Sequence, residues 1–247
     1  MLQEMIACPS WEEILSEEFV NSYSNRQPDW YFGTLSYVVY KRSYARLKEN
    51  GTTEEWHETI ARAIRGAQKI GAKYTREEAE RLFGHIFNLR CCFSGRGLWQ
   101  LGTATVDKFG MDSLLNCWGT KTSEISDFIF IIIESMLGGG VGCSLAKEFT
   151  HELPRVKNNV HVYQKNTKDA DFIVPDSKEG WSELGRKILE AFLITGKGFS
   201  YSPICIRTSG EPIKTFGGIA PGPQPLMEYA KDLVELLQSR SGKKLRT

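Results

Sequence analysis

The stretch that decides the fold runs from residue 115 to residue 142, opening with LNCW and closing with MLGGGVG. A β-like or loop segment is expected at residues 114–120. Ser123 can cap a helix over residues 124–137, and this helix is apolar on nearly all sides, which predicts that it is buried. Gly138 can end the helix. Four glycines in five positions would also let backbone approach a ligand closely.

The sequence before this stretch predicts helices, and the sequence after it mixes helices with strands and loops. The expected helices are residues 11–23 with Ser10 as cap, 35–47, 54–73, 76–89 with a Thr75–Glu78 capping box, 181–195 and 227–238. The remaining segments are β-like or loop at 91–103, a polar loop or hairpin at 158–171, a buried strand at 202–207 and a glycine- and proline-rich loop at 213–225. This order predicts an N-terminal helical region, residues 1–90, followed by an α/β domain, residues 91–247.

Composition excludes several classes of protein. With 41% hydrophobic and 25% charged residues in 247, the chain is globular rather than disordered. A net charge of +1 gives no field for nucleic acid or membranes. The N-terminus has no signal-peptide pattern, and the longest apolar run, residues 128–133, is too short to span a bilayer. A cytoplasmic setting with cysteines as thiols is expected. The four histidines are scattered, so no metal site is expected.

Four ordered segments carry the chemistry: GRGLWQLGT at 95–103, LNCW at 115–118, MLGGGVG at 136–142, and a segment from IR at 206–207 to GEPIKTFGG at 210–218. Taken alone, Cys117 is either a buried core thiol or a redox group. Together with VYKRSYAR at 39–46 and FIVPDSKEGW at 172–181, these segments resemble the adenosylcobalamin-dependent ribonucleotide reductases, in particular the monomeric ribonucleoside-triphosphate reductases. The resemblance runs from near Phe19 to the C-terminus and corresponds to the N-terminal part of that family.

The resemblance implies a fold and a reaction. The fold is α/β, with N-terminal helices outside a ten-stranded α/β barrel of which this chain holds the first half. The reaction replaces the ribose 2′-hydroxyl with hydrogen, using a thiyl radical that forms when adenosylcobalamin is cleaved. Two cysteines supply the reducing equivalents, become a disulfide, and are reset by a thioredoxin-type reductant. The implied partners are a ribonucleoside triphosphate, an allosteric deoxynucleotide and a complementary C-terminal half.

The resemblance also assigns residues. Cys117 matches one member of the reducing pair, Asn116 would lie beside the nucleotide, and Gly139, Gly140 and Gly142 match the loop that approaches the substrate. The regulatory loop is expected within residues 148–171, where an insertion found in monomeric members would be short here. Dimerisation is therefore an open possibility.

The sequence contains no Asn-x-Cys-x-Glu pattern for the radical cysteine, and no cysteine placed to partner Cys117. The chain alone is therefore expected to be inactive. A split gene, an intein and a fragment are the three explanations left open. An alternative function is a nucleotide-binding or regulatory module without catalysis. A core role is expected for Cys143, and a structural role for the adjacent Cys91–Cys92 pair, since neighbouring cysteines rarely form a disulfide. Basic residues at 41–48 are read as a solvated helix surface, and Arg207 and Lys214 as surface charges or phosphate contacts.

Overall fold

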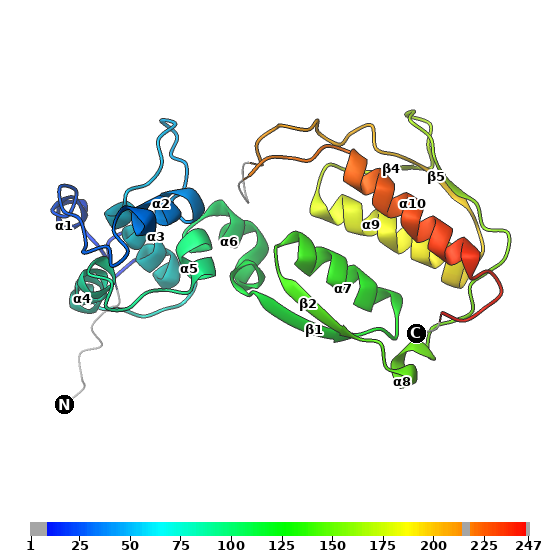
Figure 1. Ribbon diagram of the computed structural model, residues 1–247, viewed down its shortest axis with the longest axis horizontal. Coiled ribbons are helices and arrows are strands. Elements are labelled where there is room, and N and C mark those ends of the chain that lie inside the picture. The colour runs from blue at the N-terminus through cyan, green and yellow to red at the C-terminus, as the bar shows by residue number, and fades with distance from the viewer. Residues whose placement is uncertain (1–8, 214–217, 246–247) are drawn as a thin grey trace. The chain divides into compact units, whose positions relative to one another are not determined.

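The computed structural model describes residues 9–213 and 218–245, and it divides between Leu115 and Asn116 into two compact units (Figure 1). No helix among these residues is long and apolar enough to cross a membrane. Unit 1 contains the helices α1 (Glu17–Asn21), α2 (Thr34–Ser43), α3 (Trp56–Lys69), α4 (Arg76–Phe87), α5 (Gly95–Gln100), α6 (Ala104–Phe109) and the 3-10 helix η1 (Gly110–Leu114). Unit 2 contains β1 (Cys117–Lys121), α7 (Ile125–Met136), β2 (Gly140–Ser144), α8 (Lys147–Thr150), β3 (Val162–Gln164), β4 (Phe172–Ile173), α9 (Lys178–Glu190), the π-helical turn η2 (Ala191–Thr195), β5 (Phe199–Ser202) and α10 (Gln224–Ser239).

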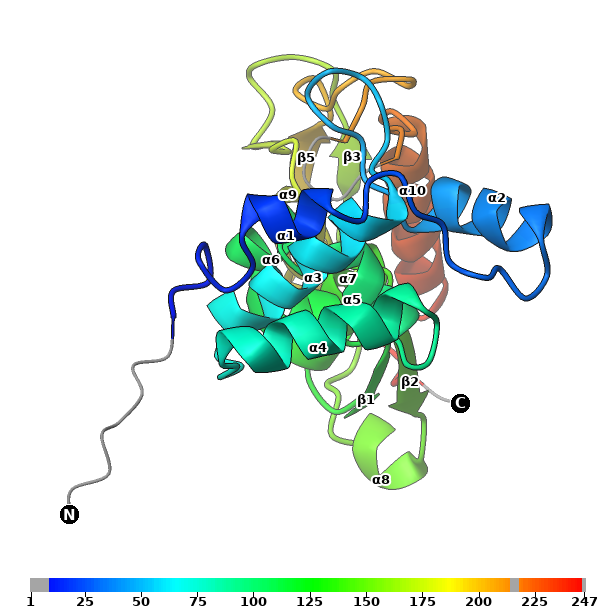
Figure 2. The same cartoon turned by 90° about the vertical axis from the view of Figure 1, so that its left-hand side faces the viewer.

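Unit 1 is built around α3 and α4, which lie side by side in the view of Figure 2. Both helices begin with a capping box. In this motif the side chain of the N-cap residue accepts the backbone N–H of a glutamate three residues later, and the side chain of that glutamate accepts the backbone N–H of the N-cap residue. The predicted Thr75–Glu78 box of α4 is confirmed. The apolar stripes of the two helices meet in a core that includes the fully buried Ile60, Ile64 and Phe83.

The N-terminal end of unit 1 differs from the prediction. Residues 11–15 form turns instead of helix, and α1 starts only at Glu17, with Ser16 as its cap. The hydroxyl of Ser10 donates a hydrogen bond to the Glu13 side chain at 3.0 Å, so the predicted cap is engaged in a local turn.

The prediction of a β-like or loop segment at residues 91–103 is wrong, because this stretch contains α5. Ser94 caps this helix by accepting the N–H of Gly97. Arg62 on α3 donates to the carbonyls of Leu98 and Leu101, so α5 is fixed on α3. This docking extends unit 1 beyond the predicted limit at residue 90.

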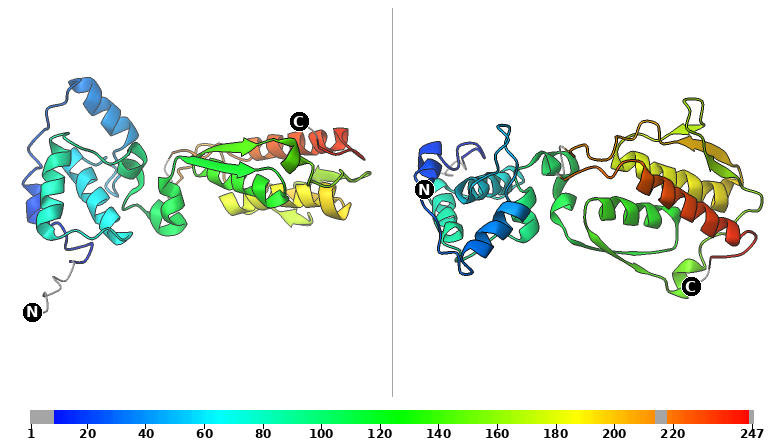
Figure 3. Two further views of the ribbon diagram at one scale, coloured as in Figure 1. Left: turned by 90° about the horizontal axis from the view of Figure 1, so that it is seen from below. Right: turned by 45° about the horizontal axis from the view of Figure 1, so that its top comes forward.

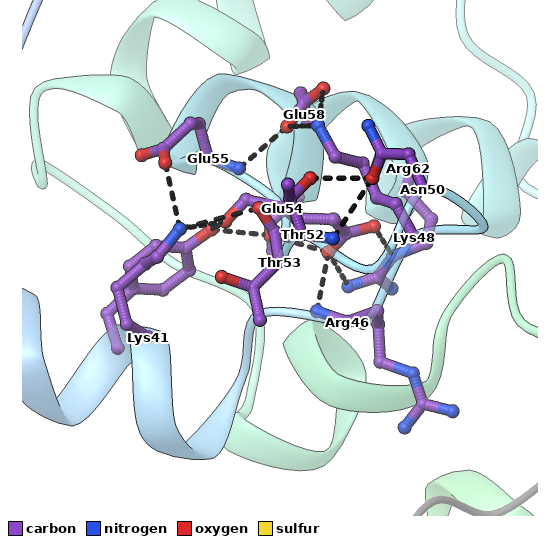
Figure 4. A network of polar contacts seen from close by, with 12 residues as sticks. Lys41, Arg46, Lys48, Asn50, Thr52, Thr53, Glu54, Glu55, Glu58 and Arg62 are labelled. Carbon is purple, nitrogen blue, oxygen red and sulfur yellow. Dashed lines mark hydrogen bonds and ion pairs between the residues drawn. The ribbon is translucent and has the colours of Figure 1, made fainter.

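A polar network joins α2, the following loop and α3 (Figure 4). At its centre the buried Glu54 accepts hydrogen bonds from Arg62, from the Thr59 hydroxyl and from the backbone N–H of Arg46. Lys41 pairs with Glu55 at 2.8 Å, and a second lysine, Lys48, pairs with Glu58 at 2.9 Å. The expectation of a merely solvated basic surface is therefore wrong for these lysines, which tie three segments together.

Unit 2 holds two parallel sheets. β1 and β2, which α7 connects along the chain, pair directly with each other in the first sheet. The second sheet has the strand order β3, β5, β4. Figure 3 shows β1 and β2 on one side of α7. The core of the unit includes the fully buried Leu184, Ile188, Phe192, Leu226 and Ala230, contributed by α9, η2 and α10. Helices and parallel strands confirm the predicted α/β class.

Several boundaries in unit 2 shift for local reasons. The predicted strand at 202–207 lies earlier, as β5, because Pro203 has no N–H to continue the ladder. The predicted polar loop or hairpin at 158–171 contains β3, which pairs in parallel with β5 instead of within a hairpin. Ser177 caps α9, so this helix begins at Lys178 instead of Trp181. Part of the predicted loop at 213–225, residues 214–217 with Lys214, lies outside the described residues.

The prediction that the helix after Ser123 is buried holds only in part. Within α7, Ile129 is buried, but the other large apolar side chains are half-buried or exposed. The reason is that α7 packs against β1, β2 and α9 and has more apolar surface than these elements cover. Ser123 is not the cap either: Glu124 takes that position, in a capping box with Asp127.

Candidate active site

The two predicted motifs around Cys117 and the glycines form one continuous ladder. In the parallel register, Cys117 lies opposite Gly140, and Gly119 lies opposite Gly142. The N–H of Gly140 donates to the carbonyl of Asn116 at 2.7 Å. The structure thus brings together four of the predicted site residues: Cys117, Gly140 and Gly142 on β1 and β2, and Asn116 just before β1.

Alternation along these strands gives the ladder two different faces. Trp118 and Val141 lie on the face toward α7 and are half-buried. Cys117, Gly140 and Gly142 lie on the other face and are exposed. We call this second face the glycine face; besides Cys117 it carries Gly119, Lys121, Gly140, Gly142 and Ser144. The Cys117 thiol therefore stands on a surface where backbone, not bulky side chains, would meet a ligand.

The glycines of residues 138–142 divide into different roles. Gly138 has φ +78° and ends α7, with its N–H and that of Gly139 donating to the carbonyls of Ser135 and Glu134. This is the Schellman arrangement, so the expected helix stop is confirmed. A Cβ on Gly139 would lie 2.8 Å from Cδ1 of Trp118. Gly139 thus has a packing reason to be glycine, independent of any substrate.

Gly139→Ala is expected to destabilise unit 2 by about 1–3 kcal/mol, because the added methyl overlaps the Trp118 ring and the Glu134 carbonyl. Gly119→Ala is the matched control, since a Cβ there meets nothing within 4 Å. Urea unfolding of both variants and the unchanged chain measures the difference. Equal stability of the two variants would contradict the packing role of Gly139.

Asp127 is a residue that the sequence interpretation missed. Its carboxylate accepts hydrogen bonds from the Ser123 and Glu124 N–H groups, and from the hydroxyls of Ser123 and Thr120 on β1. Burial acts to raise the pKa of Asp127, but these hydrogen bonds outweigh it and the pKa lies below its ordinary value. The carboxylate therefore stays ionised and fixes the end of β1 to the start of α7. The three-residue spacing of Glu124 and Asp127 was the signal for this capping box.

The other cysteines do not supply a partner for Cys117 among the described residues. All cysteines there are free and exposed, and Cys8 lies outside them. Cys143 pairs in register with Thr120, on the face opposite to Cys117, so the two thiols cannot reach each other. The expected core role of Cys143 is wrong, because β2 is exposed at this position. Both cysteines of the Cys91–Cys92 pair are also free and exposed.

Arg207, a candidate for contact with phosphate, forms an ion pair within the chain. Arg207 donates to Asp176 at 2.7 Å, in an ion pair between the segments that follow β5 and β4. This ion pair gives Arg207 a structural role. Within the described part of the chain, no group of three or more His, Cys, Asp or Glu side chains could hold a metal ion.

Comparison with known proteins gives consistent results. The protein-family model described as "Ribonucleotide reductase alpha domain" matches residues 15–103. A second family model, described as "B12-dependent ribonucleotide reductase, insertion domain", matches residues 146–237. A crystal structure titled as a B-12 dependent (class II) ribonucleotide reductase superposes with a TM-score of 0.82 and 28% identity, over 94% of this chain and 41% of that one. The chain belongs to the adenosylcobalamin-dependent ribonucleotide reductases.

Curated relatives of this chain agree with that assignment. The probable adenosylcobalamin-dependent ribonucleoside-triphosphate reductase of Dictyostelium discoideum is 32% identical over 255 residues, covering 93% of this chain and 34% of the relative. The corresponding enzyme of Euglena gracilis is 30% identical, covering 93% and 33%. That of Lactobacillus leichmannii is 32% identical over 297 residues, covering 95% and 40%. The chain thus spans about a third to two fifths of the length of these relatives.

Two details of these comparisons refine the predictions from sequence. The matched insertion domain extends over residues 146–237, well beyond the stretch 148–171 considered from sequence. The alignment with the Lactobacillus leichmannii enzyme runs over more positions than this chain has residues, so that relative contains segments that are absent here. The candidate site, residues 116–142, lies between the two matched regions, and its residue roles remain proposals.

Proposed function

We propose that this chain forms the front part of the active site of an enzyme that reduces ribonucleoside triphosphates to 2′-deoxyribonucleotides for DNA synthesis. The observation that carries the proposal is the exposed Cys117 thiol on the glycine face, directly opposite Gly140. The relatives that align with this chain are named ribonucleoside-triphosphate reductases, which supports the substrate class.

In the proposed reaction, Cys117 is one of two thiols that reduce the ribose. The two thiols lose two electrons and two protons and form one disulfide bond. The C2′–O bond breaks, the oxygen leaves as water, and hydrogen takes its place at C2′. Because a disulfide needs Cα atoms within about 7 Å, the second thiol must come close to Cys117 on the glycine face. A thioredoxin-type dithiol would then reduce the disulfide by exchange.

The residues around Cys117 would hold the nucleotide. Gly140 and Gly142 lack side chains on the face that carries Cys117, so a sugar could approach the thiol without meeting a Cβ. Asn116 and Gly139 flank this surface and are proposed to contact the nucleotide as well. For Gly139 the contact would be through backbone, since its position is already constrained by Trp118.

Adenosylcobalamin, on which the named relatives depend, would supply the radical that starts the reaction. Among the described residues no side chains are assigned to a site for this cofactor. No step is therefore assigned to this chain through the cofactor, and the cofactor's contacts are proposed to come from the complementary C-terminal part.

Regulation and cellular setting complete the proposal. An allosteric deoxynucleotide is proposed to act through the insertion-domain region, of which residues 148–171 are the first part. A cytoplasmic location fits the free thiols of the described residues, because a reducing compartment keeps such thiols from pairing.

Complementation tests the function. The chain alone is expected to form no deoxynucleotide from ribonucleoside triphosphates, adenosylcobalamin and a dithiol, because the radical cysteine and the second thiol are absent. Co-expression with the remaining part of the reductase is expected to restore turnover. Turnover by the chain alone would contradict the proposal. Nucleotide binding without turnover in the completed protein would favour a regulatory module instead.

A further inference from the structure

The most exposed apolar surface in unit 1 lies on and just before α2. Five large apolar side chains, Tyr31, Phe32, Leu35, Val38 and Val39, are exposed to 74%, 80%, 66%, 51% and 47%. Leu35, Val38 and Val39 are spaced by three and four residues, which puts them on one side of the helix. We call these five residues the α2 outer face. Single exposed apolar residues are common, but a contiguous group of this size marks an interaction surface.

The opposite side of α2 packs against other residues of unit 1. The exposure of the α2 outer face is therefore not the result of a helix without tertiary contacts. Tyr40 is buried, and its hydroxyl lies 2.8 Å from the Thr59 hydroxyl and 3.1 Å from the carbonyl of Glu54. Lys41 pairs with Glu55 at 2.8 Å. Trp30 stacks on Tyr40, with ring centroids 5.9 Å apart. These contacts fix the rotation of α2 and present the outer face in one orientation.

A hollow of about 560 Å³ adjoins the start of α2. Its lining combines an aromatic wall, Trp30 and Tyr37, with the polar side chains of Gln27, Asp29 and Thr34. The surface as a whole therefore offers protruding apolar side chains next to a recess with a carboxylate. Its chemical complement is an apolar surface carrying a basic or hydrogen-bonding side chain.

We infer that the α2 outer face docks the part of the reductase that lies outside this chain. This inference rests on the proposed function, in which a complementary part completes the enzyme. The relatives align with 93–95% of this chain but with only 33–40% of their own length, so well over half of each relative has no counterpart here. So large a remainder must bury apolar surface against this chain to form one enzyme. The α2 outer face gathers five of the exposed large apolar side chains of unit 1 within residues 31–39.

The experiment is a binding measurement that does not depend on turnover. The chain is co-expressed with the rest of the reductase, and both parts carry different tags. The double variant Leu35→Ser/Val39→Ser is expected to weaken association by about a hundredfold, because two buried apolar contacts are lost. Leu47→Ser is the matched control, since Leu47 is 73% exposed in the same unit but lies outside the α2 outer face. It is expected to leave association unchanged.

Melting of the chain alone separates docking from folding. The double variant is expected to keep the melting temperature of the unchanged chain, because both side chains are exposed there. A large fall would mean that these side chains already support the fold of the chain itself, and would overturn the inference. Unchanged association in the double variant would overturn it as well. Self-association of the chain alone that disappears in the double variant would assign the face to a second copy, again against the inference.

Catalysis and docking can fail separately in this design. Cys117→Ser in the same co-expression is expected to retain association while turnover is lost. Intact association with no turnover even in the unchanged protein would contradict the proposed function and leave the docking inference standing.

Discussion

Cys117→Ser is expected to reduce deoxynucleotide formation by the completed enzyme to background. A serine hydroxyl is close in size to the thiol but cannot form a disulfide, so the two-electron reduction of the ribose loses one of its two donors. Serine in place of Cys117 adds no bulk to the glycine face. Because the Cys117 side chain is exposed and free, its replacement is not expected to disturb folding. The loss should therefore appear in turnover, while nucleotide affinity stays close to that of the unchanged enzyme.

Cys143→Ser is the matched control for this experiment. Cys143 lies on the neighbouring strand of the same ladder, is equally free and exposed, and stands on the opposite face. It is expected to leave turnover unchanged. Multiple turnover measured with a thioredoxin-type reductant, together with nucleotide binding, distinguishes the outcomes. Full turnover in Cys117→Ser would remove the redox role and leave a binding function for the glycine face.

Arg62→Met is expected to lower the stability of unit 1 by about 3–5 kcal/mol. The Arg62 and Glu54 side chains are only 14% and 9% exposed, and they pair at 2.7 Å. Removal of Arg62 leaves the buried Glu54 carboxylate without its ionic partner, although the hydrogen bonds from Thr59 and the Arg46 N–H remain. Loss of one partner of a buried pair is far more costly than the pair itself is worth. The same substitution also removes the donors that fix α5 to α3 at Leu98 and Leu101.

Hydrogen exchange of the slowest amides in α3 measures this effect within unit 1, whatever the stability of unit 2. Lys69→Met serves as control, because Lys69 lies on the same helix and pairs with Asp107 through side chains that are 37% and 49% exposed. Its expected cost is below about 1 kcal/mol. The double variant Glu54→Gln/Arg62→Met should recover part of the loss, since the buried charge is then absent. Equal losses for Arg62→Met and Lys69→Met would refute the argument.

The parts of the fold that could be predicted are those with local signals. The Thr75–Glu78 box, the helix stop at Gly138 and the apolar stripe of α3 depend on residues within one or two turns of each other. The resemblance of ordered motifs was also sufficient to identify the family. In contrast, α5 has few helix-favouring residues of its own; it depends on Arg62, which is far away in sequence. The short strands β3 and β4 depend likewise on pairing with β5.

The candidate site shows the same division. The sequence indicated Cys117 and the glycine segment, but not that Cys117 faces Gly140, because register is a property of two strands. It also could not separate Gly139, which accommodates Trp118, from Gly140 and Gly142, which leave the thiol's face bare. Cys143 illustrates the reverse error: a free cysteine in an apolar setting is usually core, but here the strand is exposed at that position.

The short connection between β1 and β2 through α7 has a consequence for the order in which parts of the enzyme fold. The ladder contacts that place Cys117 opposite Gly140 join residues 116–117 to residue 140, so the loop to be closed is short and its entropic cost is small. We therefore expect this piece to fold during synthesis, before the polypeptide that supplies the second thiol has emerged. The reactive sulfur would then be in place, and open to oxidants, for as long as the enzyme waits for its remaining part.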